Sequence, residues 1–163
     1  MLTQLTRSQI IELQKRYPQK RSALIPALHL AQAELGYLPQ EVQAEVAALF
    51  DLDQNEVHAV VTFYDMFFEK PCGKRLLHVC KNLSCMLRGA DQVTDAICKK
   101  LNITPGETDA EGEFTLIPSE CLGACDCAPV VLLDRQLMGP VHPEDVERLL
   151  SEAKGEKQEG GHA

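Results

Sequence analysis

Two closely spaced pairs of cysteines constrain this chain more than any other feature of its sequence. Cys80 and Cys85 are separated by four residues, and Cys121 and Cys125 are separated by three. Each pair lies in a loop that directly follows a predicted strand. Because neighbouring parallel strands of one sheet end side by side, these two loops can meet at one edge of the sheet. The fold is therefore expected to bring four thiols together in a site with four cysteine ligands.

The spacing of the cysteines leaves two kinds of metal centre open. A zinc ion is held at about 2.3 Å by each sulfur, and structural zinc sites typically use Cys-x2-Cys turns, which neither pair has. A [2Fe–2S] cluster is larger and takes two protein sulfurs for each iron, so the wider spacings suit it better. Gly123 and Ala124, inside the second pair, leave room for backbone N–H groups to approach the sulfurs. The residues alone favour iron–sulfur and keep zinc as the alternative.

The remaining cysteines are expected to have different roles. Cys98 lies in a predicted helix, where a thiol is typically buried, and Cys72 lies in a linker, where we expect it to be inert. Cys127 comes two residues after Cys125, within reach of the same centre, but we keep it outside the ligand set. A thiol oxidoreductase using Cys125 and Cys127 is a further alternative. It is weakened because no Cys-x-x-Cys begins a helix, the arrangement that normally lowers a thiol pKa.

The composition of the chain argues against several functions and cellular locations. The 163 residues carry a formal net charge of −8 with no stripe of Lys and Arg, which disfavours nucleic-acid binding. No apolar stretch approaches the roughly 20 residues of a membrane-spanning helix, and the N-terminus lacks an export signal. We therefore expect an intracellular protein without a membrane span. In a reducing compartment, an odd count of seven cysteines argues against a disulfide framework.

Motifs for catalysis on a bound substrate are missing from the sequence. There is neither a G-x-G-x-x-G nor a P-loop pattern, and the five histidines are isolated from one another in sequence. We expect these histidines to be surface or core residues rather than ligands. A chain with a redox centre and no substrate site must exchange its electrons with a partner protein.

The first part of the chain, residues 1–70, has the pattern of a helical domain. It contains a single glycine, Gly36, and its apolar residues recur at helical spacing. Capping-box patterns occur at Thr6 and at Asp53. Four short helices with short connections predict a four-helix bundle over residues 1–70. The predicted helices begin near Thr6, Ser22, Pro39 and Asp53.

The pattern changes after a linker at residues 69–74. Strands are predicted over residues 75–79, 114–117 and 130–133 and near 137–138, with helices over 89–101 and from 143 onward. This β-α-β-β-β-α order predicts an α/β domain of thioredoxin-like size over residues 71–153, with helices on a small mixed sheet. The whole chain is thus expected to be α+β in two parts. Residues 154–163 are polar and glycine-rich, which predicts a flexible tail.

The residues around the cysteines carry a specific resemblance. The run CLGACDCAP at 121–129, preceded by CKNLSCMLRG at 80–89, resembles the small [2Fe–2S] subunit of NADH:quinone oxidoreductase, which is the E subunit of bacterial complex I. GYLP at 36–39 and VVTFY at 60–64 extend the resemblance over nearly the whole chain. Ala59 stands where some members of this thioredoxin-like ferredoxin family have glycine, and Cys127 stands where a polar residue is common.

The resemblance implies a helical bundle followed by a ferredoxin domain in which Cys80, Cys85, Cys121 and Cys125 hold one [2Fe–2S] cluster. It also implies a larger flavoprotein partner that binds FMN and NADH, and further peripheral-arm subunits. The expected function is electron transfer within the NADH dehydrogenase complex, at the cytoplasmic face of the membrane, with no catalytic activity of the chain alone. Because the same module occurs in NAD-linked hydrogenases and formate dehydrogenases, the equivalent diaphorase subunit is the alternative.

Overall fold

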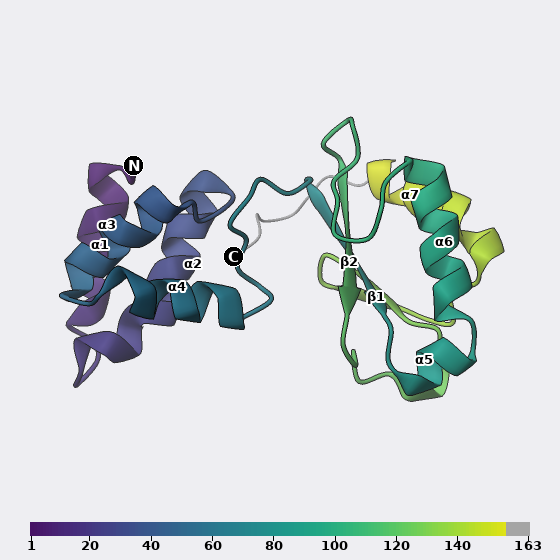
Figure 1. Cartoon of the computed structure of the whole chain (residues 1–163), viewed down its shortest axis with the longest axis horizontal. Helices are drawn as coiled ribbons and strands as arrows, with labels where there is room; N and C mark the ends of the chain where they lie inside the picture. Colours follow the sequence, from purple (N-terminus) through teal and green to yellow (C-terminus); the bar gives the residue numbers. More distant parts are fainter. Residues whose placement is uncertain (156–163) are drawn as a thin grey trace. The chain divides into compact units, whose positions relative to one another are not determined.

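The computed structural model describes residues 1–155, which divide into a helical unit, Met1–Pro71, and a sheet unit that begins at Cys72 (Figure 1). Lys154 and Gly155, the first two residues of the expected tail, are the last two residues of a helix. The rest of that tail, residues 156–163, lies outside the described residues. Within residues 1–155, no helix is long and apolar enough to cross a membrane.

The helical unit packs its helices around one apolar core. Ile10, Leu28, Val46 and Val57 come from different helices and are all completely buried in it. Burying each such side chain contributes about 1.5–3 kcal/mol relative to leaving it in water, so this core is the main source of the unit's stability. The helices are α1 (Gln4–Gln14), the short 3-10 helix η1 (Lys20–Ala23), α2 (Leu24–Leu35), α3 (Gln40–Phe50) and α4 (Gln54–Phe63).

Local signals determine where these helices begin and end. Asp53 and Glu56 form the predicted capping box at the start of α4, and Gly36 ends α2 in the left-handed conformation with φ of 81°. The start of α1 differs from the prediction at Thr6, because Thr3 is the N-cap residue and its side chain accepts a hydrogen bond from the Thr6 N–H. Thr3 has the same N-cap chemistry as Thr6, and the prediction placed the helix start one turn too late.

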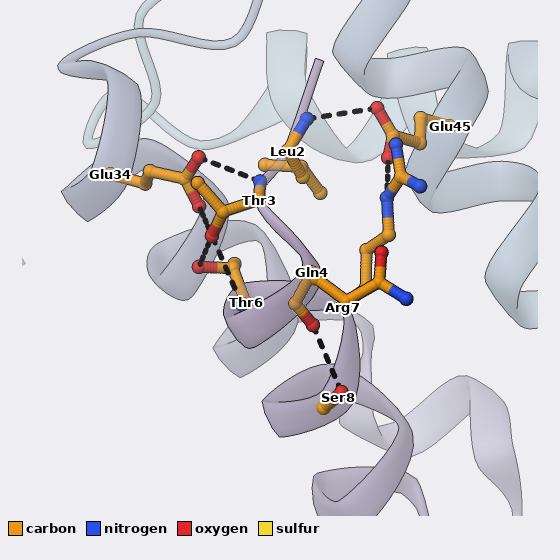
Figure 2. Close-up of polar contacts among 8 residues, drawn as sticks. All are labelled: Leu2, Thr3, Gln4, Thr6, Arg7, Ser8, Glu34 and Glu45. Atoms are coloured by element: carbon orange, nitrogen blue, oxygen red, sulfur yellow. Dashed lines mark hydrogen bonds and ion pairs between the residues drawn. The ribbon is translucent and has the colours of Figure 1, made fainter.

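Two glutamates hold the N-terminal segment against the helices behind it (Figure 2). The backbone N–H of Leu2 donates to Glu45 of α3 at 3.0 Å, and the N–H of Thr3 donates to Glu34 of α2 at 2.9 Å. Arg7 forms an ion pair with the same Glu45 carboxylate at 2.5 Å. Hydrogen-bond donors at the start of α1 are thereby paired with carboxylates of α2 and α3. These contacts hold the three helices together.

The sheet unit contains one mixed sheet whose described strands follow the order β2-β1-β3-β4. β1 and β2 are parallel, whereas β3 is antiparallel to both of its neighbours, β1 and β4. The strands are β1 (Arg75–Cys80), β2 (Phe114–Ser119), β3 (Val131–Leu133) and β4 (Gln136–Met138). The helical elements are α5 (Leu83–Leu87), α6 (Ala90–Leu101), η2 (Cys125–Cys127), η3 (Pro143–Asp145) and α7 (Val146–Gly155). The chain is therefore α+β, as expected, with α5 as an addition to the predicted order.

Helices α6 and α7 lie side by side on one face of this sheet (Figure 1). Leu77 of β1, Phe114 of β2 and Ile97 of α6 are completely buried in the shared core. Arg75 attaches the end of α7 to the sheet, because its guanidinium donates to the Ala153 carbonyl at 2.9 Å and pairs with Asp134 at 2.8 Å. These contacts give β1, which leads into the first cysteine pair, a rigid support.

Candidate metal centre

The parallel pairing of β1 and β2 brings the two cysteine loops to the same end of the sheet. Cys80, the last residue of β1, is in register with Ser119, the last residue of β2. Beyond that pair, the Lys81 N–H donates to the Ser119 carbonyl at 2.9 Å, so the two chain segments leave the sheet together. Cys121 follows two residues later. Figure 1 shows α5 and the segment after β2 at this end, which confirms the expectation that the loops meet.

Cys80 and Cys85 form a buried pair. Their exposed fractions are 3% and 2%, and they pack with the small apolar residues Ala90, Ala128 and Val130. The two thiols are within hydrogen-bonding reach of each other. A short helix makes this possible, because α5 turns the chain back after β1 and carries Cys85 inward.

The surroundings of this pair shift the pKa values of its two thiols in opposite directions. Burial would raise the pKa of Cys80, but hydrogen bonds from the backbone of Asn82 and Leu122 and from the Cys85 thiol together lower that pKa below its ordinary value. The pKa of Cys85 is raised by burial and by the neighbouring Cys80, against a hydrogen bond from the Val130 backbone. Cys80 is therefore the member of the pair that ionises first.

Cys121 and Cys125 are both exposed to solvent, unlike the first pair. The Gly123 N–H donates to the Cys121 sulfur at 3.4 Å. Cys125 begins η2 and lies close enough to Cys85 that its charge raises the pKa of Cys85. The structure thus gathers the four cysteines at one end of the sheet, but within residues 1–155 no three His, Cys, Asp or Glu side chains are already arranged around a single metal-ion position.

The chemistry of this donor set fits a sulfur-rich anionic group. Backbone N–H groups from three different segments approach the cysteine sulfurs, at Asn82, at Leu122 and Gly123, and at Val130. Hydrogen bonds of this kind stabilise negative charge on thiolates and on an iron–sulfur cluster. Gly123 has φ of 80°, and a side chain placed there would meet no atom within 4 Å, so the loop is open on that side.

The three other cysteines occupy distinct surroundings. Cys127 is half-buried beside the first pair, and its thiol donates to the Ala124 carbonyl at 3.5 Å. Cys98 is half-buried on α6 and packs against the sheet core, in line with its expected role as a small apolar side chain. Burial raises the pKa of Cys72, which is half-buried at the start of the sheet unit.

Sequence reasoning missed the parts of this site that depend on α5 and on Val130. Asn82 caps α5 by accepting a hydrogen bond from the Leu83 N–H at 2.9 Å, and an asparagine at that place was an available signal for a helix start. The contribution of the Val130 backbone had no such signal, because it comes from a segment 45 residues after Cys85 in the sequence.

Comparison with known protein families decides between the metal centres left open above. The family model for the thioredoxin-like [2Fe–2S] ferredoxins matches residues 10–154. The chain belongs to this family. Its cofactor is accordingly a [2Fe–2S] cluster, which the four thiols and their N–H donors suit, and zinc is no longer needed as an explanation.

Individual relatives of this thioredoxin-like ferredoxin come from two kinds of enzyme. The second E-type subunit of NADH-quinone oxidoreductase from Rhizobium meliloti (strain 1021) is 40% identical over 144 residues, which are 88% of this chain and 86% of the relative. The NADP-reducing hydrogenase subunit HndA of Solidesulfovibrio fructosivorans is 35% identical over 144 residues, which are 88% of this chain and 84% of that relative. Both similarities extend over the helical and the sheet units.

A solved structure shares the fold of this ferredoxin. It is an NAD+-reducing [NiFe]-hydrogenase in the H2-reduced state, with a TM-score of 0.70 and 23% sequence identity. The likeness covers 83% of this chain and 23% of the hydrogenase chain. The same arrangement of elements therefore also occurs as a part of a much longer polypeptide.

Proposed function

We propose that this chain is the electron-transfer subunit of an NADH:quinone oxidoreductase and that Cys80, Cys85, Cys121 and Cys125 hold its [2Fe–2S] cluster. The observation that carries the proposal is the meeting of two thiol pairs at the common end of two parallel strands, with backbone N–H groups directed at their sulfurs. The 40% identity to a small subunit of that complex supports the choice of complex.

The residues of this chain would contribute to electron transfer by holding charge rather than by transforming a substrate. When bound, the cluster accepts and returns one electron at a time. Cys80 and Cys85 anchor it in the packed interior, and Cys121 and Cys125 enclose it from the solvent side. The N–H groups of Asn82, Leu122, Gly123 and Val130 lower the free energy of the extra negative charge in the reduced state.

The electrons must come from a partner, which we propose is a flavoprotein subunit that binds FMN and NADH. Further subunits of the peripheral arm complete the assembly at the cytoplasmic face of the membrane. We further propose the division into a four-helix bundle over residues 1–70 and a ferredoxin domain over residues 71–153. The separate cores of the two units support that division.

A second assignment is the equivalent diaphorase subunit of an NAD-linked hydrogenase or formate dehydrogenase. The 35% identity to a subunit of an NADP-reducing hydrogenase favours it specifically. Purifying the chain with its natural partners separates the two assignments, because a hydrogenase or formate dehydrogenase subunit in the complex would replace the quinone-reducing assignment.

The ligand set is tested on anaerobically purified protein. We expect two iron and two sulfide per chain and a paramagnetic signal that appears only after reduction. Serine at any one of the four positions should abolish or alter that signal, whereas Cys98→Ser serves as the matched control and should leave it unchanged. A colourless protein that contains zinc would contradict the proposal. So would an unchanged signal in Cys80→Ser and Cys121→Ser.

A further inference from the structure

A charged bridge joins the two cysteine loops at the solvent side of the site. Lys81 directly follows Cys80, Glu120 directly precedes Cys121, and the Lys81 ammonium lies 3.0 Å from the Glu120 carboxylate. The side-chain amide of Asn82 donates to the same carboxylate at 3.4 Å. Each partner of this bridge is therefore bonded in sequence to a proposed cluster ligand on a different loop.

The bridge is too exposed to matter through packing. The side chains of Lys81 and Glu120 are 55% and 76% exposed, and ion pairs of that kind contribute little to folding stability. A solvent-exposed glutamate carboxylate is ionised at neutral pH, and here the Lys81 ammonium and the Asn82 amide lie against it. A permanent negative charge is thus held beside the loops.

That negative charge lies beside both cysteine loops. The Glu120 carboxylate belongs to the residue bonded to Cys121, and it is held at 3.0 Å by Lys81, the residue bonded to Cys80. Its field opposes further negative charge added at the cysteines, and reduction adds one electron. Lys81 offsets the field because its positive charge lies against the carboxylate.

We propose that Glu120, paired with Lys81, is a positioning residue that sets the reduction potential of the centre and joins its two ligand loops. The inference rests on the proposed function, because it takes Cys80 and Cys121 as ligands. Neutralising Glu120 removes a charge that opposes reduction, so the potential becomes more positive. Neutralising Lys81 leaves the carboxylate without its counter-charge, so the potential becomes more negative.

The experiment uses the full chain loaded with its cluster, with midpoint potentials measured by redox titration followed by electron paramagnetic resonance. Glu120→Gln and Lys81→Gln are compared with the wild type at low and at high salt. Glu147→Gln is the matched control, because Glu147 pairs with Lys100 at 2.5 Å with side-chain exposures of 77% and 50%, and both partners lie on helices outside the cysteine loops. We expect shifts of opposite sign for Glu120→Gln and Lys81→Gln, none for Glu147→Gln, and smaller shifts at high salt because ions screen exposed charges.

The opposite signs distinguish charge from loss of structure, since a general loosening of the loops would move both variants in the same direction. Shifts of the same sign, or loaded variants with the wild-type potential, would overturn this inference and leave the proposed function intact. A wild-type chain that binds no iron would overturn the proposed function and this inference with it.

Discussion

The two thiol pairs at the end of the sheet occupy neighbouring loops and differ sharply in burial. Cys80 and Cys85 are almost completely enclosed and lie within hydrogen-bonding reach of each other, whereas Cys121 and Cys125 are exposed. The first pair is held by a strand, a helix and part of the core, and the second by a loop and a single 3-10 turn. One half of the site is therefore organised by folding itself, and the other half is left for the bound group to organise.

The largest expected effect comes from removing the support beneath the buried pair. Leu77→Ala deletes a completely buried side chain of β1, three residues before Cys80, and should cost about 2–5 kcal/mol of unfolding free energy. Urea denaturation of the apo-protein measures this cost, and alkylation of Cys80 and Cys85 should become faster. The matched control is Leu28→Ala, an equally buried leucine of the helical unit. Equal alkylation of the buried pair in both variants would contradict the separate cores.

A smaller difference is expected when one thiol of each pair is replaced by a hydroxyl. Cys85→Ser places a more polar group in an apolar pocket and should cost about 1–3 kcal/mol in the apo-protein. Cys125→Ser changes an exposed position and should stay within about 0.5 kcal/mol of the wild type. Both variants should lose the normal cluster. Equal stability of the two apo-variants would show that the difference in burial has no energetic consequence.

The reactivity of the thiols is a third property in which the buried and the exposed pair should differ. In the apo-protein, iodoacetamide should modify Cys121 and Cys125 at least about tenfold faster than Cys80 and Cys85, which corresponds to a local opening free energy of about 1.4 kcal/mol. Mass spectrometry of timed samples follows each cysteine separately. The lower pKa of Cys80 acts in the opposite direction, because it increases the fraction of reactive thiolate. A reaction at Cys80 that is faster than at Cys121 and Cys125 would therefore contradict the expected protection by burial.

The smallest effect concerns Cys98, which serves as a reference thiol away from the site. Burial, and next the Asp95 carboxylate, raise its pKa, so less thiolate is present at any given pH. Its alkylation rate should therefore rise at a higher pH than the ordinary thiol value of about 8.5. Asp95→Asn should move this pH profile part of the way back, because burial remains. A profile centred at or below the ordinary value would contradict the sign of the shift.

Much of this arrangement followed from local patterns in the sequence. The strand into Cys80, the helix after Gly89 and the capping box at Asp53 appear where periodicity and capping chemistry indicated them. The parallel pairing of β1 and β2 was also enough to bring the loops together. These features depend on neighbours in sequence or on general rules of chain topology.

What the sequence could not show depends on contacts between distant segments. The unequal burial of the two pairs arises because Ala128 and Val130, which follow the second pair, pack over Cys80 and Cys85 rather than over Cys121. Helix α5 is only five residues long, too short for a hydrophobic period to reveal it. The Lys81–Glu120 bridge joins residues 39 positions apart, and no local pattern signals such a contact.

The register between β1 and β2 has a consequence for how such a chain tolerates insertions and deletions. Because Cys80 is aligned with Ser119, the distance that matters for the site is counted from the end of each strand, not along the 35 residues between Cys85 and Cys121. Residues added to the connection between α6 and β2 are absorbed at the far end of the strand. A single residue added between Ser119 and Cys121 would displace the second pair from the first, although every cysteine would still be present. The crossover can therefore change in length without moving the site, whereas the place of Cys80 at the end of β1 and the one-residue spacer between Ser119 and Cys121 cannot.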